Sequence, residues 1–193
     1  MRRRSPRLLS VIAAIILTPA LLLSVQGCSR HHSDKPSDET VSGSHTEPYY
    51  GFLGEISYDS SISAMVLEPM AGEHEPGIQY RSVTDLTGLV ASGETDIILY
   101  FYTSLSSDVY GVTAGTEDLA QVLDGQILIV AIDAMEHQSL CEDLGVSALP
   151  EYVLIQGGAA VALFEGYNYE YWTMDDVAEW VESYGYTIDY DLL

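Results

Sequence analysis

Side chains that could act as nucleophiles or metal ligands are few in this 193-residue chain. It contains two cysteines, Cys28 and Cys141, and five histidines. A single thiol can attack a disulfide, but a second thiol must resolve the mixed disulfide that forms. His31, His32 and His45 lie in a polar segment in which no other ligand has the spacing of a metal site. We therefore predict no bound metal and no cofactor.

A serine nucleophile is also disfavoured by its surroundings in the sequence. Ser106 follows an apolar run, and as a nucleophile it would need a base within hydrogen-bond reach. His137 lies on a predicted helix face with Leu140, Cys141 and Leu144, and no G-x-S-x-G motif is present. Cys141 has the spacing of a small buried side chain on this face. We expect no catalytic residue, with thiol chemistry through Cys141 or through the thiols of a partner as the alternative.

The N-terminus has the pattern of an export signal. Four arginines among the first seven residues precede an apolar run over residues 8–25. The next residues, Val25-Gln26-Gly27-Cys28, resemble the lipobox of bacterial lipoproteins. This resemblance implies a signal peptide over residues 1–27, cut before Cys28, and acyl chains such as palmitate on Cys28. An uncleaved signal anchor is the alternative, and either reading places the rest of the chain at a membrane, facing outside the cytoplasm.

The chain that would remain after cleavage is strongly acidic. It keeps three basic residues against 29 acidic ones, a net charge of −26 without histidine. Nucleic acid and anionic lipid headgroups would both repel such a chain, so we expect no nucleic-acid partner. Whether the acidic surface binds cations stays open. Residues 28–48 are polar with almost nothing to bury, and we interpret them as a disordered tether.

The remaining sequence predicts an α/β fold. Residues 49–76 alternate as two strands joined by a turn at residues 59–61, an extra N-terminal β-hairpin. From residue 78 strands and helices alternate, and the run at residues 127–132 is apolar enough to be buried on both faces of a sheet. A helix over residues 117–123 is expected to have Thr116 as its N-cap. The last helix begins with the capping-box pair Thr173 and Asp176, and Gly157-Gly158 marks a hairpin turn before it.

This order, with a final hairpin and a C-terminal helix, resembles the thioredoxin fold. The segment LGVSALPEYVLIQGG at residues 144–158 is similar to the family's stretch around its cis-proline, and Phe164-Glu165-Gly166 matches the glycine before its last helix. The resemblance covers residues 78–185. It implies a thioredoxin-like domain over residues 77–186, with a central mixed β-sheet flanked by helices and an acidic tail at residues 187–193.

The resemblance also implies that this chain lacks the two redox cysteines of the family. Residues 101–105 stand where the family has an aromatic pair leading to Trp-Cys-Gly-Pro-Cys, so its two cysteines map to Ser106 and Val109, with Ser107 and Asp108 between them. Without a thiol at either position, dithiol exchange has no route. Tyr100 stands where the family has a buried acid.

We therefore expect a redox-inactive module that binds an envelope protein or peptide. The thioredoxin fold binds extended peptides beside its cis-proline, which implies a contact surface made of the vestigial active-site loop, Ser106 to Val109, and of Leu149 and Pro150. The segment GYNYEYW at residues 166–172 is a second candidate contact, or a loop packed on the sheet edge. Its aromatic residues are Tyr167, Tyr169, Tyr171 and Trp172.

Overall fold

The computed structural model of the chain describes residues 47–105, 109–166 and 171–193. The expected signal peptide and most of the expected tether lie outside these ranges. Within them, none of the helices has the length and apolar composition that crossing a membrane requires.

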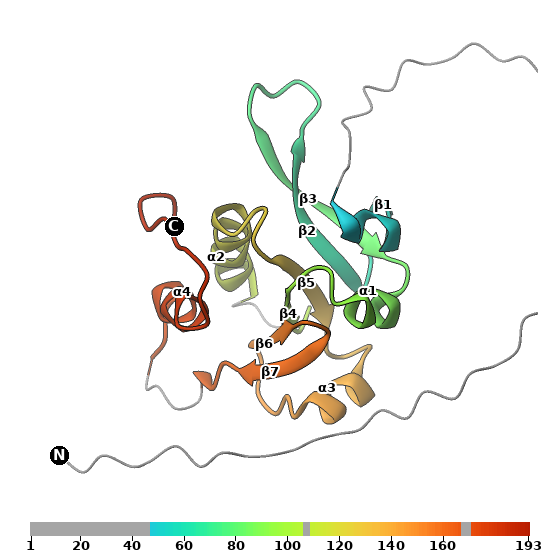
Figure 1. Cartoon of the computed structure of the whole chain (residues 1–193), viewed down its shortest axis with the longest axis vertical. Helices are drawn as coiled ribbons and strands as arrows, with labels where there is room; N and C mark the ends of the chain where they lie inside the picture. The colour runs from blue at the N-terminus through green and yellow to red at the C-terminus, as the bar shows by residue number, and fades with distance from the viewer. Residues whose placement is uncertain (1–46, 106–108, 167–170) are drawn as a thin grey trace, which may run out of the picture. The chain divides into compact units, whose positions relative to one another are not determined.

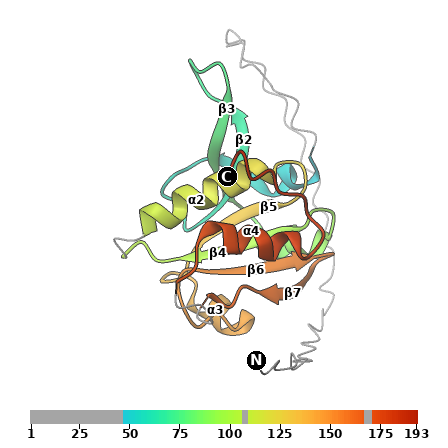
Figure 2. The ribbon, with the colours of Figure 1, turned by 90° about the vertical axis from the view of Figure 1, so that its left-hand side faces the viewer.

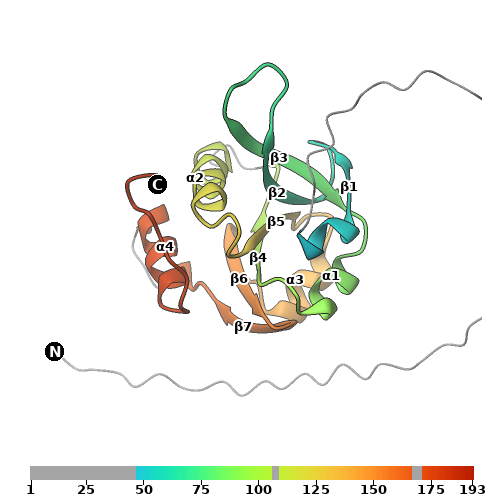
Figure 3. The ribbon, with the colours of Figure 1, turned by 45° about the horizontal axis from the view of Figure 1, so that its top comes forward.

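A seven-stranded mixed sheet forms the centre of the described part (Figure 1). The strands lie in the order β1-β3-β2-β5-β4-β6-β7; β4 and β5 run parallel, and every other neighbouring pair is antiparallel. Figure 3 shows this succession from β1 to β7. The strand bounds are Leu53–Ile56 (β1), Ile62–Pro69 (β2), Pro76–Val83 (β3), Ile97–Tyr102 (β4), Leu128–Asp133 (β5), Glu151–Gln156 (β6) and Ala159–Leu163 (β7).

Helices cover both faces of this sheet. Helices α2 and α4 pack on one face, in front of the sheet in Figure 2, and α1 and α3 pack on the other. A 3-10 helix, η1, precedes β1. The helix bounds are Pro48–Phe52 (η1), Leu86–Ser92 (α1), Val109–Val122 (α2), Gln138–Leu144 (α3) and Met174–Glu182 (α4).

The α/β fold predicted from the sequence is confirmed. From β3 onward the elements alternate as predicted, and β5 is buried over its whole length because a sheet with helices on both faces leaves its central strands no solvent. Gly157 and Gly158 both have positive φ angles at the β6–β7 turn, and Thr173 and Asp176 form the capping box of α4. Both devices were predicted by local residue types.

The pairing of the N-terminal strands differs from a simple β1–β2 hairpin. β1 and β2 lie on opposite edges of β3, and the hairpin at this end of the fold joins β2 to β3. β2 also pairs with β5, through Ile62–Ile132 to Met65–Ile129. The sheet therefore continues without a break across residue 77, where the sequence predicts the domain to begin.

A buried ion pair fixes this N-terminal arrangement. Arg81 on β3 donates from Nε to Glu68 Oε1 over 2.7 Å and from Nη2 to Glu68 Oε2 over 3.0 Å. Its Nη1 donates to the carbonyl of Gly54 on β1, and Tyr50 Oη donates to Glu68. Arg81 and Glu68 together thus connect η1, β1, β2 and β3, with the bidentate geometry that makes such pairs strong.

Two local predictions were wrong. Helix α2 begins at Val109 instead of residue 117, so Thr116 is a buried interior residue and not an N-cap. Its hydroxyl oxygen lies 2.7 Å from the Val112 carbonyl oxygen and 2.8 Å from Tyr152 Oη, which satisfies it inside the helix. His137 is the N-cap residue of α3 and stands outside the helix face on which the sequence places it.

Candidate functional site

The candidate site lies where β4 ends and β6 begins. The Leu149–Pro150 peptide bond is cis, the geometry that the family resemblance implies. β6 starts at the next residue, Glu151, and its Cα pairs with that of Phe101 near the end of β4. Antiparallel pairing therefore places the chain after Tyr102 and the cis-proline at the same end of two neighbouring strands.

Exposed leucines mark this end of the sheet. Leu105 has 79% of its surface exposed, and Leu149, directly before the proline, has 39%. A partner that covers these exposed apolar side chains gains binding free energy, because burial removes apolar surface from water.

Hydrogen bonds hold the first residues beyond β4. Ser104 Oγ donates to Asp133 Oδ2 over 2.8 Å, and Asp133 Oδ1 accepts from the backbone N–H of Met135. Asp133 is the last residue of β5, so the carboxylate connects the ends of the two parallel strands. This contact was not predicted, because nothing in the sequence pairs Ser104 with a residue 29 positions away.

His137 and Cys141, the one histidine and the one thiol of residues 78–185, both make other contacts in the structure. His137 Nε2 lies 2.9 Å from Ser61 Oγ. Cys141 is partly buried on α3, where it packs together with Leu140 and Leu144 against the buried core on that face of the sheet. Burial, followed by the charge of Glu142, raises the pKa of this thiol, which lowers the thiolate fraction that thiol exchange requires.

Glu151 is the unusual residue of this region. Its side chain has no exposed surface, and neither carboxylate oxygen has a hydrogen-bond partner within the described part of the chain. Burial first, and then the charge of Glu165, raise its pKa from 4.5 to about 7; the nearby N–H of Gly166 acts in the opposite direction. The sequence places an acid here, but its complete burial depends on packing that the sequence pattern does not reveal.

The two described aromatic residues of the segment at residues 166–172 have different surroundings. Tyr171 is 86% exposed. Trp172 packs edge-on against Phe164 and Tyr152, with ring centroids 5.5 and 6.1 Å apart. Trp172 therefore supports the packed-loop alternative, and Tyr171 remains a candidate contact.

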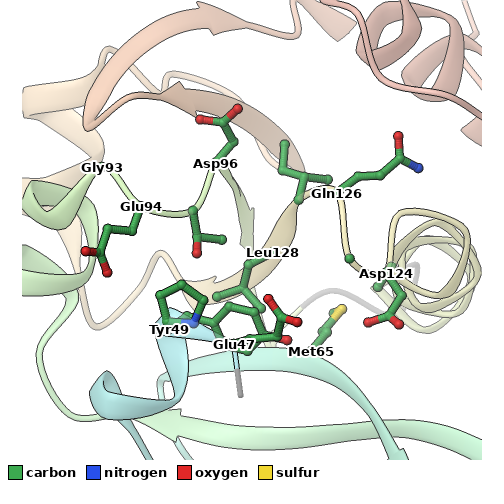
Figure 4. Close-up of a pocket in the computed structure, with 14 residues that line it drawn as sticks. Glu47, Tyr49, Met65, Gly93, Glu94, Asp96, Asp124, Gln126 and Leu128 are labelled. Carbon is green, nitrogen blue, oxygen red and sulfur yellow. The ribbon is translucent and has the colours of Figure 1, made fainter. Parts of the chain in front are cut away.

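A cavity of about 390 Å³ lies at the opposite end of β4 and β5 (Figure 4). Four acidic residues line it, but Asp96 is occupied by bonds from Tyr186 Oη and the N–H of Gly157. Burial and the nearby Glu47 raise the pKa of Asp124. Within the described ranges, no three His, Cys, Asp or Glu side chains are grouped so that they could hold a metal ion.

Several predicted site residues lie outside the described part of the chain, and their roles stay predictions. Val109 is the first residue of α2, and its predicted contact is also untested. The residues outside the described ranges are Cys28, Ser106, Ser107, Asp108, Tyr167 and Tyr169.

Comparisons with known proteins point to one family. The family model described as Thioredoxin matches residues 80–180. Mitochondrial thioredoxin 3 of Saccharomyces cerevisiae, in its oxidized form, is 16% identical, with 52% of this chain and 88% of that chain covered and a TM-score of 0.44. A mutant thioredoxin from Halobacterium salinarum is 22% identical, with 51% and 83% covered and a TM-score of 0.41. No curated protein matches the chain.

Proposed function

Because this chain belongs to the thioredoxin family, we propose that it uses the thioredoxin fold as a redox-inactive binding module, tethered by lipid to the outer face of a membrane. The module binds an extended segment of an envelope protein or peptide beside Pro150. The exposed pair Leu105 and Leu149 is the observation that supports this best, because it offers apolar surface where the family binds peptides.

The position of the one cysteine in the matched region supports redox inactivity. Cys141 is partly buried on α3, and its pKa is raised instead of lowered. A redox-active thiol in this family would need to be exposed and acidic. The chain contains no second thiol in this region that could resolve a mixed disulfide.

Reduction of insulin by the purified full-length protein in detergent tests redox inactivity. We expect no turnover above the rate with dithiothreitol alone, and an unchanged trace for Cys141→Ala. Turnover that Cys141→Ala abolishes would establish the alternative, an oxidoreductase acting through this thiol.

Capture from native membranes tests binding beside the proline. Leu105→Asp and Leu149→Asp should each lose the captured partner, because a carboxylate in an apolar contact must be desolvated. Val161→Asp is the matched control, since Val161 is also an exposed apolar residue but lies on β7. Equal loss with all three variants, or with none, would contradict a contact at this end of the sheet.

Metabolic labelling with palmitate in a bacterial host tests the tether. The wild-type chain should carry the palmitate label and sediment with membranes. A Cys28→Ser chain of mature length should carry no label and should not sediment with membranes. Two or more acyl chains give durable anchoring, because each buried methylene contributes about 0.8 kcal/mol. Membrane association of an unlabelled Cys28→Ser chain at full length would instead establish an uncleaved signal anchor.

A further inference from the structure

A cavity of about 500 Å³ lies between α2 and the sheet, on the side of the N-terminal strands. This volume is in the range of pockets that hold small molecules. β2 and β3 form one wall, β4 and β5 form the floor, and α2 forms the other wall. Its lining includes four tyrosines, Tyr58, Tyr80, Tyr100 and Tyr102, together with Ser104 and Glu117.

Four tyrosine rings dominate this lining. Tyr58, in the turn between β1 and β2, and Tyr80, on β3, have ring centroids 5.6 Å apart; Tyr100 and Tyr102 lie on β4, with centroids 5.7 Å apart. Tyr58, Tyr80 and Tyr100 use their hydroxyls in bonds within the protein, to Gln79, Glu117 and Thr113. Tyr100 is buried and stacks on both Tyr102 and Tyr152, so Tyr58, Tyr80 and Tyr102 offer a ligand most of the aromatic surface. The π faces of such rings are electron-rich and attract cations.

The charge around the cavity has one sign. Glu117 on α2 accepts a hydrogen bond of 2.6 Å from Tyr80 Oη. Burial, followed by the charges of Asp133 and Glu136, raises the pKa of Tyr102, so these two carboxylates also act on the lining. Among the described residues the one Lys or Arg is Arg81, which binds Glu68 and Gly54. No lysine or arginine of the described part thus neutralises the cavity.

We propose that this cavity binds a small organic cation of the quaternary ammonium class. Aromatic rings around a site recognise methylated ammonium groups, because the ring quadrupoles attract the cation. Removing such a cation from water costs little, since its methyl groups keep it weakly hydrated. Glu117 supplies the opposite charge at the edge of the tyrosine cluster.

A divalent metal ion fits this cavity less well. Calcium takes six to eight oxygen ligands, and magnesium needs a near-octahedral set. The lining contributes one carboxylate, Glu117, and mostly aromatic and hydroxyl groups. A neutral ligand would gain no charge attraction from Glu117, the carboxylate of the lining.

This proposal is independent of peptide binding beside Pro150. The lining of the cavity comes from α2, from β2 to β5 and from the turn before β2, whereas Pro150 precedes β6, on the other side of β4. The cavity lining reaches Ser104, which precedes Leu105, but the variants that test the two proposals, at Glu117 and Tyr58 for the cation and at Leu105 and Leu149 for the peptide, are different residues.

Titration of the full-length protein in detergent tests the proposal. The probes are choline, tetramethylammonium, and dimethylbutanol, the neutral analogue of choline in which carbon replaces nitrogen; binding is followed by calorimetry. We expect saturable binding of both cations at millimolar concentration or below, and at least fivefold weaker binding of the neutral alcohol. Absence of saturable cation binding, or equal binding of the alcohol, would overturn the proposal.

Variants then locate the site. Glu117→Gln and Tyr58→Leu should each weaken choline binding at least fivefold, because one removes the charge and the other a π face. Tyr58 is 66% exposed, so its replacement should leave the fold intact, which circular dichroism checks. Asp118→Asn and Tyr190→Leu are matched controls, exposed or partly exposed residues outside the cavity lining. Equal effects of site and control variants would show non-specific attraction to an acidic surface and would contradict this site.

Discussion

Replacing Glu151 with glutamine should change how the stability of the protein depends on pH. The side chain is buried without a hydrogen-bond partner in the described part of the chain, and its pKa is raised from 4.5 to about 7. The folded state therefore favours the protonated carboxyl. The contribution of this proton to stability is complete below about pH 4.5, and it is lost as the pH rises through about 7.

The size of this effect follows from the two pKa values. A tenfold change in proton affinity corresponds to about 1.4 kcal/mol. The difference between 4.5 and about 7 then lowers the free energy of unfolding by roughly 3 kcal/mol once the carboxyl is ionised. Such a loss is a large fraction of the stability of a domain of this size.

Urea unfolding of the wild type and Glu151→Gln at a series of pH values measures this effect. The whole protein gains stability on acidification because its negative charges repel one another, so the informative quantity is the difference between the two proteins. We expect the wild type to lose roughly 3 kcal/mol relative to the variant between about pH 4 and about pH 8.5. Glu142→Gln, which changes an exposed acid on α3, should show no such trend. A difference that stays constant with pH would refute the reasoning.

Other substitutions test the packing, each by urea unfolding. Arg81→Met should cost about 3–5 kcal/mol because it removes the guanidinium that binds the buried Glu68 carboxylate at both oxygens, and adding Glu68→Leu should recover much of this; a loss below about 1 kcal/mol would contradict a structural ion pair. Thr116→Val should cost about 1–3 kcal/mol by depriving Tyr152 Oη of a partner, and an unchanged midpoint would show that the hydroxyl finds another. Gly158→Ala should cost more than about 1 kcal/mol, since φ is +81° and the new Cβ would lie 2.9 Å from the Val90 carbonyl oxygen. Gly111→Ala, in open space on α2, should stabilise by about 0.5–1 kcal/mol, and similar results for both glycines would contradict the role of backbone angle.

Local signals in the sequence predicted most of the elements. The apolar runs of β4 and β5, the glycines at the β6–β7 turn and the capping box of α4 each depend on neighbouring residues, so their residue types were sufficient. The start of α2 was missed because its first half contains Gly111 and Gly115 and is followed by Thr116, residues that favour other structures in isolation. Packing overrides that preference, since Gly115 lies against Met174 of α4.

The sequence pattern did not predict which strands pair or which polar side chains are buried. The residues of β2 predicted a strand, but nothing in them specifies that β3 and β5 are its neighbours. The same limit applies to the candidate site. The resemblance implied the cis bond before Pro150, whereas the burial of Glu151 and the contact of Ser104 with Asp133 depend on how distant segments meet.

The two outermost strands of the sheet have a consequence for how copies of this protein behave together. A long, regular outer strand leaves a row of unpaired amides and carbonyls that can recruit a strand of another molecule and start aggregation. Here β1 has four residues and β7 has five, and the pairing of each with its neighbour contains a shift in register. Irregular outer strands of this kind make poor templates, and β1 also carries the exposed Glu55. We therefore expect the copies to remain separate even when they are crowded on a surface.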